Sequence, residues 1–166
     1  MIGVNQNFPD KIHILSKFES KLATKKIQKK LIQILEKINH KIFSFEKITY
    51  PTIPNCRIIF DFGLAEEKNF NYIDEEEKNN FLKTLKEKKV KFLDLFCSIR
   101  YYKIIQKKRT ALNFDYYMLR ILFDNKKIEA KVFHDRGPRY ISPEEIVKFI
   151  FNEFNKNSTI KIVSIK

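Results

Sequence analysis

The sequence predicts a single α+β domain in which an antiparallel three-stranded meander and one or two further strands pack against about three helices. Three observations predict this fold class. Residues 92–105 alternate between apolar and polar side chains, and two further strand-like runs follow around a short polar turn. Helical spacing, or a capping sequence, occurs at three other places. A chain of 166 residues with no internal repeat or linker fits one domain, residues 1–166.

The first half of the chain predicts helices with one strand between them. Apolar residues recur at helical spacing from Ser16 to Phe43, and the opposite face carries lysines that include Lys25 and Lys29. That face is either solvated or a source of phosphate contacts. A short apolar run, 57–64, reads as a strand. Asp74 and Glu77 then have the spacing of a capping box, so a helix should run from residue 75 to about 88.

The second half predicts the meander and its last helix. The strand 92–105 is followed by a loop, 106–113, and a tight turn at 124–127 joins strands 114–123 and 128–133. Ser142, Pro143 and Glu145 form a helix start, with serine as the cap and glutamate completing the box. In order, the predicted elements are an irregular or partly flexible start (1–15), a helix (16–43), a strand (57–64), a helix (75–88), three strands (92–105, 114–123, 128–133), a helix (143 to about 154) and a last strand (159–165).

The composition favours a folded protein with an acidic partner. With 43% hydrophobic and 14% aromatic residues, the chain is outside the disordered class. Its net charge of +13 favours nucleic acid as the partner, then an anionic membrane surface, then an acidic protein. A compositional bias toward Lys, Asn, Ile and Phe is an alternative source of the lysine excess. It does not explain why five of the six arginines fall between positions 100 and 139.

The sequence indicates neither a metal nor a cofactor. Cys56 and Cys97 lie far apart and belong to no paired-cysteine motif, so we expect free thiols in a reducing compartment. The N-terminal residues lack the apolar core of a signal peptide, and no stretch is apolar for the length of a membrane span. We therefore expect a cytoplasmic protein without a membrane partner.

Three residues resemble the D…(D/E)xK signature of the PD-(D/E)xK nucleases: Asp115, Glu129 and Lys131. The resemblance covers the second half of the chain and implies carboxylates that hold a divalent metal, with a lysine that positions the attacking water. It requires the turn to lie midway between Asp115 and Glu129, at Leu122, which is inside an apolar run.

The predicted hairpin rules out that metal site. A two-residue turn at Asn125–Lys126 places Glu129 opposite Leu122, seven residues along the strand from Asp115. At about 3.3 Å per residue the separation exceeds about 20 Å. The turn also places Asp115 on the opposite face of the sheet from Glu129. A nuclease with another carboxylate set, Asp61 or Asp94 with Glu129, remains a third interpretation of function.

One face of the predicted meander is apolar and should pack on the helices. On that face Leu119 lies opposite Val132 and Tyr117 opposite His134, which we interpret as a hydrogen-bonded structural histidine. At the open end Asp115 lies opposite Arg136, and we expect an ion pair there that tethers the following loop.

The other face should carry a row of like charges. Matching Tyr101 to Leu119 places Arg100 beside Arg120 and Lys131, next to an apolar row of Tyr102, Met118 and Phe133, with Tyr116 opposite Asp135. Like charges that face each other destabilise a sheet. The row therefore favours an anionic partner, with aromatic rings available to stack on bases. The alternatives are that Asp94, Glu129 and Asp135 neutralise the row, or that a helix covers it.

A second candidate site is the loop 134–141, because two arginines flank Gly137–Pro138 just before a helix N-terminus that attracts anions. A purely structural turn is an equal alternative. The sequence thus predicts an accessory, non-catalytic nucleic-acid-binding protein; a protein-interaction subunit of a larger assembly is the alternative. The predicted contact residues are Arg100, Tyr102, Arg109, Tyr116, Arg120, Lys131, Phe133, His134, Arg136, Arg139, Lys25 and Lys29.

Overall fold

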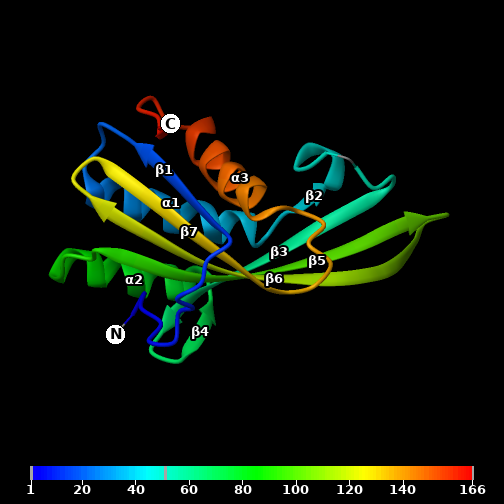
Figure 1. Cartoon of the computed structure of the whole chain (residues 1–166), viewed down its shortest axis with the longest axis horizontal. Coiled ribbons are helices and arrows are strands. Elements are labelled where there is room, and N and C mark those ends of the chain that lie inside the picture. Colours follow the sequence, from blue (N-terminus) through cyan, green and yellow to red (C-terminus); the bar gives the residue numbers. More distant parts are fainter. Residues whose placement is uncertain (1, 51, 166) are drawn as a thin grey trace.

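The computed structural model of the chain describes residues 2–50 and 52–165. It confirms the α+β class: within these residues, eight mostly antiparallel strands form one sheet, and three α-helices accompany it (Figure 1). The sheet has more strands than the sequence predicts. The elements are β1 (Ile14–Glu19), α1 (Thr24–Ile38), β2 (Ile42–Ser44), the 3₁₀ helix η1 (Phe45–Lys47), β3 (Cys56–Glu66), β4 (Asn69–Tyr72), α2 (Glu75–Glu87), β5 (Phe92–Ile105), β6 (Lys108–Asp124), β7 (Lys127–Arg136), α3 (Pro143–Lys156) and β8 (Val163–Ser164).

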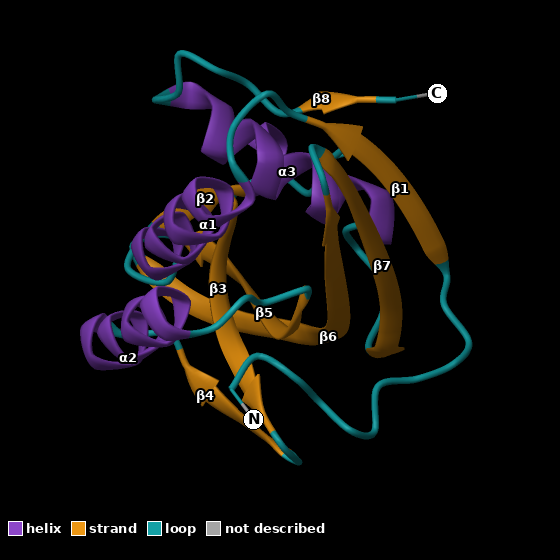
Figure 2. Cartoon of the chain, turned by 90° about the vertical axis from the view of Figure 1, so that its left-hand side faces the viewer, coloured by secondary structure: helices purple, strands orange, loops and turns teal. Residues whose placement is uncertain are grey.

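The sheet is strongly curved, and the helices lie on its concave side (Figure 2). Its strand order is β2-β3-β5-β6-β7-β1-β8, and β4 pairs with the C-terminal end of β3. The core lies between the concave face and the helices, where Phe60 stacks on Phe149 at 4.9 Å and Phe18 contacts Phe151 at 4.4 Å between ring centroids. Burial of apolar area on this one face leaves the convex face for other contacts.

Both predicted helix starts are confirmed. The Asp74 side chain accepts a hydrogen bond from the backbone N–H of Glu77 at 2.9 Å. At the start of α3, the Ser142 hydroxyl accepts from the N–H of Glu145, and the Glu145 carboxylate accepts from the N–H of Ser142. These side chains satisfy backbone donors that a helix leaves without intrahelical partners.

The long helix predicted over residues 16–43 is wrong at both ends. Residues 14–19 form β1, whose side chains alternate and which pairs with β7, for example Phe18 opposite Ile128. The helix starts at Thr24 and buries Ile27, Leu31 and Leu35. The apolar residues of β1 and α1 together match the spacing of one long helix. Periodicity alone therefore predicted a single helix over both elements. The last strand, predicted over 159–165, is only Val163–Ser164.

The predicted loop 106–113 does not exist. Gln106 and Lys107 alone form the turn, with φ angles of +50° and +65°, and both strands continue to it. Two consecutive residues with positive φ match the type I′ turn, whose twist suits a hairpin. Figure 1 shows that the ends of β5 and β6 project beyond the body of the molecule. We call residues 102–111 of this hairpin the arm.

The short turn changes the register between β5 and β6. Arg100 lies opposite Phe114, and Arg120 lies opposite Asp94, six residues from the predicted partner. The predicted row of Arg100, Arg120 and Lys131 is therefore wrong, and so is the neighbouring row that began with Tyr102. Phe96 takes that place beside Met118 and Phe133.

The β6–β7 hairpin is confirmed over most of its length. Asp124 pairs with Lys127 around the turn, and Leu122 lies opposite Glu129, so the geometry that separates Glu129 from Asp115 is correct. A β-bulge between Tyr116 and Tyr117 shifts the far end, so that Tyr116 faces Arg136 instead of Asp135.

Candidate nucleic-acid interface

Arg120 belongs to the structure of the protein and not to a free surface. Its guanidinium donates to the fully buried Asp94 carboxylate through Nε at 2.7 Å and Nη2 at 2.8 Å. The same carboxylate accepts the backbone N–H of Asn5 at 2.7 Å. Phe8 and Phe92 each lie 4.5 Å from the guanidinium carbon. The hydrogen bonds to Asp94 raise the pKa of Arg120, so this charge is fixed by its neutralising partner.

Three other arginines lie on the open part of the convex face. Arg100 contacts Asp61 at 3.1 Å, and both side chains remain partly exposed. Arg109 lies over the ring of Tyr102 at 5.0 Å, and Arg136 over the ring of Tyr116 at 4.5 Å. Cation–π attraction holds the guanidinium groups of Arg109 and Arg136 over these rings. Both side chains remain exposed.

A line of aromatic rings crosses this face and ends in solvent. Phe70 on β4 contacts Phe96 on β5 at 5.3 Å, and Phe96 contacts Tyr116 on β6 at 5.7 Å. Tyr116 stacks on Phe114 at 6.2 Å with 16° between the ring planes. Phe114 is 44% exposed. We call these four residues the ring column.

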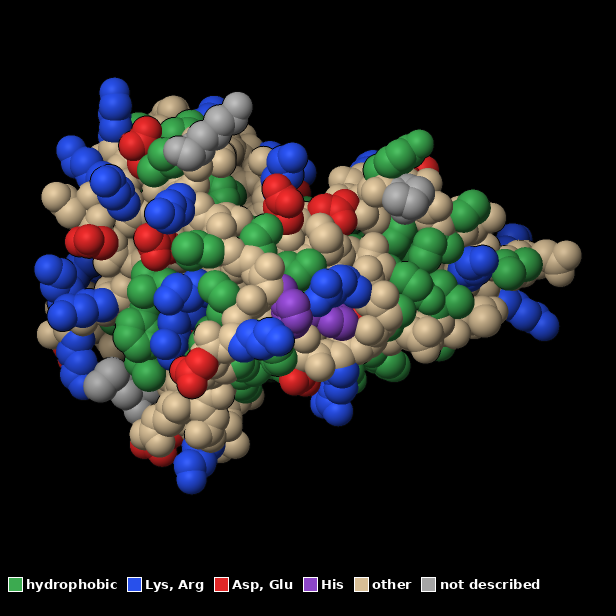
Figure 3. All heavy atoms as spheres, in the orientation of Figure 1, with side chains coloured by type: hydrophobic (Ala, Val, Ile, Leu, Met, Phe, Trp, Pro, Cys, Tyr) green, Lys and Arg blue, Asp and Glu red, His purple; other side chains and the backbone are tan. Residues whose placement is uncertain are grey.

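The arm is basic and lacks acidic residues. Its sequence, YKIIQKKRTA, contains Lys103, Lys107, Lys108 and Arg109 and no Asp or Glu. Figure 3 shows Lys and Arg side chains beside hydrophobic ones at this projecting end. Because charges at a protruding tip face solvent on several sides, their potential reaches an approaching anion without local cancellation.

The predicted ion pair between Asp115 and Arg136 is wrong, because the bulge moves Arg136 to the other side. Asp115 is fully buried and accepts hydrogen bonds from four donors. These are the Tyr101 hydroxyl at 2.6 Å, His134 Nε2 at 2.8 Å, and the backbone N–H groups of Arg139 and Tyr140 at 2.7 and 3.0 Å. Burial, followed by the bond to Asp115, raises the pKa of Tyr101 far above its usual range, so the hydroxyl stays a donor.

This Asp115 cluster changes the interpretation of the loop 134–141. The N–H groups that a phosphate would use are already taken, two by Asp115 and two within the α3 capping box. The loop is therefore a structural connection, tethered by Asp115 in place of the predicted ion pair. The Arg139 side chain itself remains exposed. His134 is nearly buried against Tyr117, with ring centroids 4.8 Å apart, as expected for a structural histidine.

The remaining predicted contact residues lie apart from the arm. Phe133 is on the convex face and stacks with His13 at 5.1 Å. Lys131 lies opposite Arg120 on the same face. Lys25 and Lys29 are exposed on α1, on the helix-bearing side of the sheet. The structure thus gathers Arg100, Arg109, Tyr116 and Arg136 into one surface. Tyr102 is buried beneath Arg109, so its ring is not available for stacking as predicted. Arg120, His134 and the two α1 lysines are not part of this surface.

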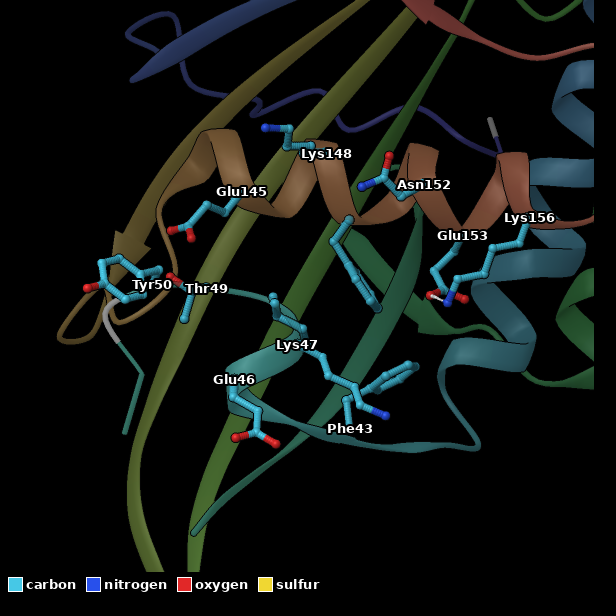
Figure 4. A pocket seen from close by; sticks show the side chains of 12 residues that line it. Phe43, Glu46, Lys47, Thr49, Tyr50, Glu145, Lys148, Asn152, Glu153 and Lys156 are labelled. Atoms are coloured by element: carbon cyan, nitrogen blue, oxygen red, sulfur yellow. Dashed lines mark hydrogen bonds and ion pairs between the residues drawn. The ribbon is translucent and has the colours of Figure 1, made fainter. Parts of the chain in front are cut away.

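A cleft near the helices has no dominant charge. A cleft of about 450 Å³ lies between α3 and the η1 region. Figure 4 shows Glu145, Lys148 and Lys156 on one wall and Glu46, Lys47 and Tyr50 on the other, with Lys156 paired to Glu153 at 2.6 Å. Because acidic and basic side chains alternate around it, the cleft offers no selective attraction for an anion.

Two further findings concern the described residues alone. Within 2–50 and 52–165, no three His, Cys, Asp or Glu side chains are grouped in a way that would hold a metal ion. Over the same residues, no helix is long and apolar enough to cross a bilayer.

Comparison of the chain with protein-family models, curated proteins and solved structures finds no match.

Gly137 supports the Asp115 cluster through its missing side chain. Its φ is +113°, and a Cβ there would overlap the carbonyl oxygen of Phe114 and crowd the Asp115 carboxylate. Gly137→Ala is therefore expected to lower the free energy of unfolding by about 2 kcal/mol or more. Urea unfolding measures the loss. Gly63→Ala is the comparison for a smaller loss, because the atom nearest to the Cβ added there is a side-chain carbon at 3.2 Å. An unchanged midpoint for Gly137→Ala would show that the loop can move away.

Sequence reasoning missed the part of the site that depends on the arm. Phe114, Lys103, Lys107 and Lys108 were placed in or beside a loop and were not among the predicted contacts. The turn carries Gln and Lys where hairpin turns usually carry Gly or Asn, so it had no clear turn signal. The one available signal was the absence of acidic residues over ten positions.

Proposed function

We propose that the protein binds nucleic acid without catalysis, through the convex face at and beside the arm. The observation that carries the proposal is the combination of four basic residues and no acidic residue in a projecting hairpin. Arg109 of the arm lies over the ring of Tyr102, and Arg136 beside the arm lies over the ring of Tyr116.

Two physical arguments support the proposal. Lysines and arginines that contact phosphates release counterions, which gives sequence-independent affinity. The planar guanidinium group of each arginine offers several N–H donors in a fixed fork, a geometry that suits phosphate oxygens. The ion pairs at Arg100–Asp61 and Arg136–Asp135, at 3.1 and 3.6 Å, are partly exposed. Exposed pairs contribute little, so a phosphate can replace the carboxylate at small cost.

The arm is tested by removing its charge. The variant Lys107→Gln/Lys108→Gln/Arg109→Gln is expected to weaken binding to a short oligonucleotide and to reduce the slope of log affinity against log salt by about 2. Fluorescence anisotropy across a salt series measures both quantities. The matched control is Lys83→Gln/Lys86→Gln/Lys88→Gln, which removes the same charge from the exposed face and end of α2, at the other end of the molecule (Figure 1). Equal losses in the two variants would contradict a localised site.

A protein partner is the second candidate, and the tip of the arm favours it. Ile104 and Ile105 are exposed there. The N–H of Ile104 donates to Asn55 on the β3 side. Because the backbone N–H of Ile104 points toward Asn55, Ile104 and Arg109 form a pair without hydrogen bonds between them in the antiparallel β5–β6 ladder. The N–H and C=O of Arg109 therefore point away from β5. A partner strand could pair with that edge. A complex that survives high salt would support this candidate, because phosphate-driven binding weakens there.

A further inference from the structure

The ring column ends at Phe114, beside the arm, in an exposed aromatic ring. Phe114 sits on the convex face and is 44% exposed, while the other three rings of the column are partly buried. Its ring stacks with Tyr116, with 6.2 Å between the centroids and 16° between the planes, and this contact restricts its orientation. The ring therefore offers a held aromatic surface to solvent.

Three guanidinium groups lie on the same face as Phe114, two of them in partly exposed ion pairs with Asp61 and Asp135. Arg100 is its cross-strand partner on β5, and Arg136 lies over Tyr116, the next ring of the column. Arg109 follows along the same face of β6, over Tyr102. An aromatic ring with guanidinium groups around it matches the two parts of a nucleotide: a base stacks on the ring, and the flanking phosphates contact the arginines.

Single strands alone present base faces to such a ring. In a duplex the faces are stacked on one another, and only base edges line the grooves. To reach a base face in a duplex, the ring would have to separate two stacked base pairs, which kinks the duplex and costs about a few kcal/mol per step. An unpaired base can instead be laid on the ring directly, as aromatic side chains on sheet surfaces do in single-strand recognition.

We propose that the ligand is a single-stranded nucleic acid and that one of its bases stacks on Phe114, with phosphates held by Arg109 and Arg136. This inference rests on the proposed function, because it specifies the ligand of the same surface. The stacked base extends the ring column by one ring, and the arm supplies the remaining phosphate contacts.

The chain itself provides a sensitive test, because it contains no tryptophan. Phe114→Trp introduces a single indole at the proposed stacking position. Its fluorescence should be quenched on addition of oligo(dT) or oligo(U) of about twelve nucleotides, the upper part of the range that one small domain covers. Tyr50→Trp is the control, since Tyr50 is 90% exposed on the helix-bearing side, beside α3. Its indole should not respond.

Affinity gives the second readout. Phe114→Leu keeps an apolar side chain but removes the ring, and it should weaken single-strand binding by roughly tenfold while leaving the unfolding midpoint unchanged. The same strands annealed into a duplex should bind less tightly than the single strands, with no quenching at position 114.

The outcomes separate the two proposals. Quenching at position 114 and loss in Phe114→Leu support the stacking site. Duplex binding that is equal or tighter, without quenching, overturns the single-strand inference and leaves the proposed function in place. No binding to either form at low salt overturns both.

Discussion

Replacement of Asp115 by Ala is expected to lower the free energy of unfolding by about 4 kcal/mol. The carboxylate accepts four hydrogen bonds at a fully buried position, and the Tyr101 hydroxyl is buried with it. Each buried donor left without a partner costs about 1–3 kcal/mol. Urea unfolding measures the loss.

Two further variants test the cause of that loss. Asp115→Asn keeps the shape but places an amide NH₂ against the N–H donors, so an intermediate loss is expected. Asp61→Ala removes a carboxylate from a partly exposed ion pair with Arg100 and should cost less than about 1 kcal/mol. A similar loss in Asp61→Ala and Asp115→Ala would show that the hydrogen bonds to Asp115 do not cause the difference.

Removal of Asp94 is the second change with a large expected effect. Asp94→Ala leaves Arg120 charged between Phe8 and Phe92 and leaves the N–H of Asn5 without its acceptor. Loss of one member of a buried ion pair costs about 3–5 kcal/mol. Thermal or urea unfolding measures it, and faster hydrogen exchange at Asn5 should report release of the N-terminal segment.

The double variant Asp94→Ala/Arg120→Met provides the control. Because it removes both charges and keeps an apolar side chain between the two rings, it should be more stable than Asp94→Ala alone. Stability losses that simply add would contradict the view that the unpaired arginine causes the damage.

The sequence identified those elements whose signals are local. The starts of α2 and α3 follow from capping side chains within three residues, and the β6–β7 hairpin follows from a polar turn between alternating runs. The strand β1 was lost because its apolar residues precede helix α1 and match helical spacing by chance. Periodicity cannot separate two short elements that share apolar residues.

The site depends on register, which local signals do not set. The turn at Gln106–Lys107 and the bulge between Arg100 and Tyr102 together place Asp94 beside Arg120 and Phe114 beside Arg100. A shift of six residues replaced a predicted row of like charges with an ion pair between Arg120, which is partly exposed, and the fully buried Asp94. The same shift exposed the arm. Arg100, Arg109 and Arg136 therefore still lie at the proposed site, although most of their predicted cross-strand neighbours were wrong.

The most direct test of nucleic-acid binding is the affinity of the unmodified protein for a short single-stranded oligonucleotide across a salt series. With about four phosphate contacts, the affinity should fall about fiftyfold between roughly 50 and 200 mM salt. An affinity that does not change with salt, or no binding at the lowest salt, would contradict the account and would show that the basic arm does not contact phosphates.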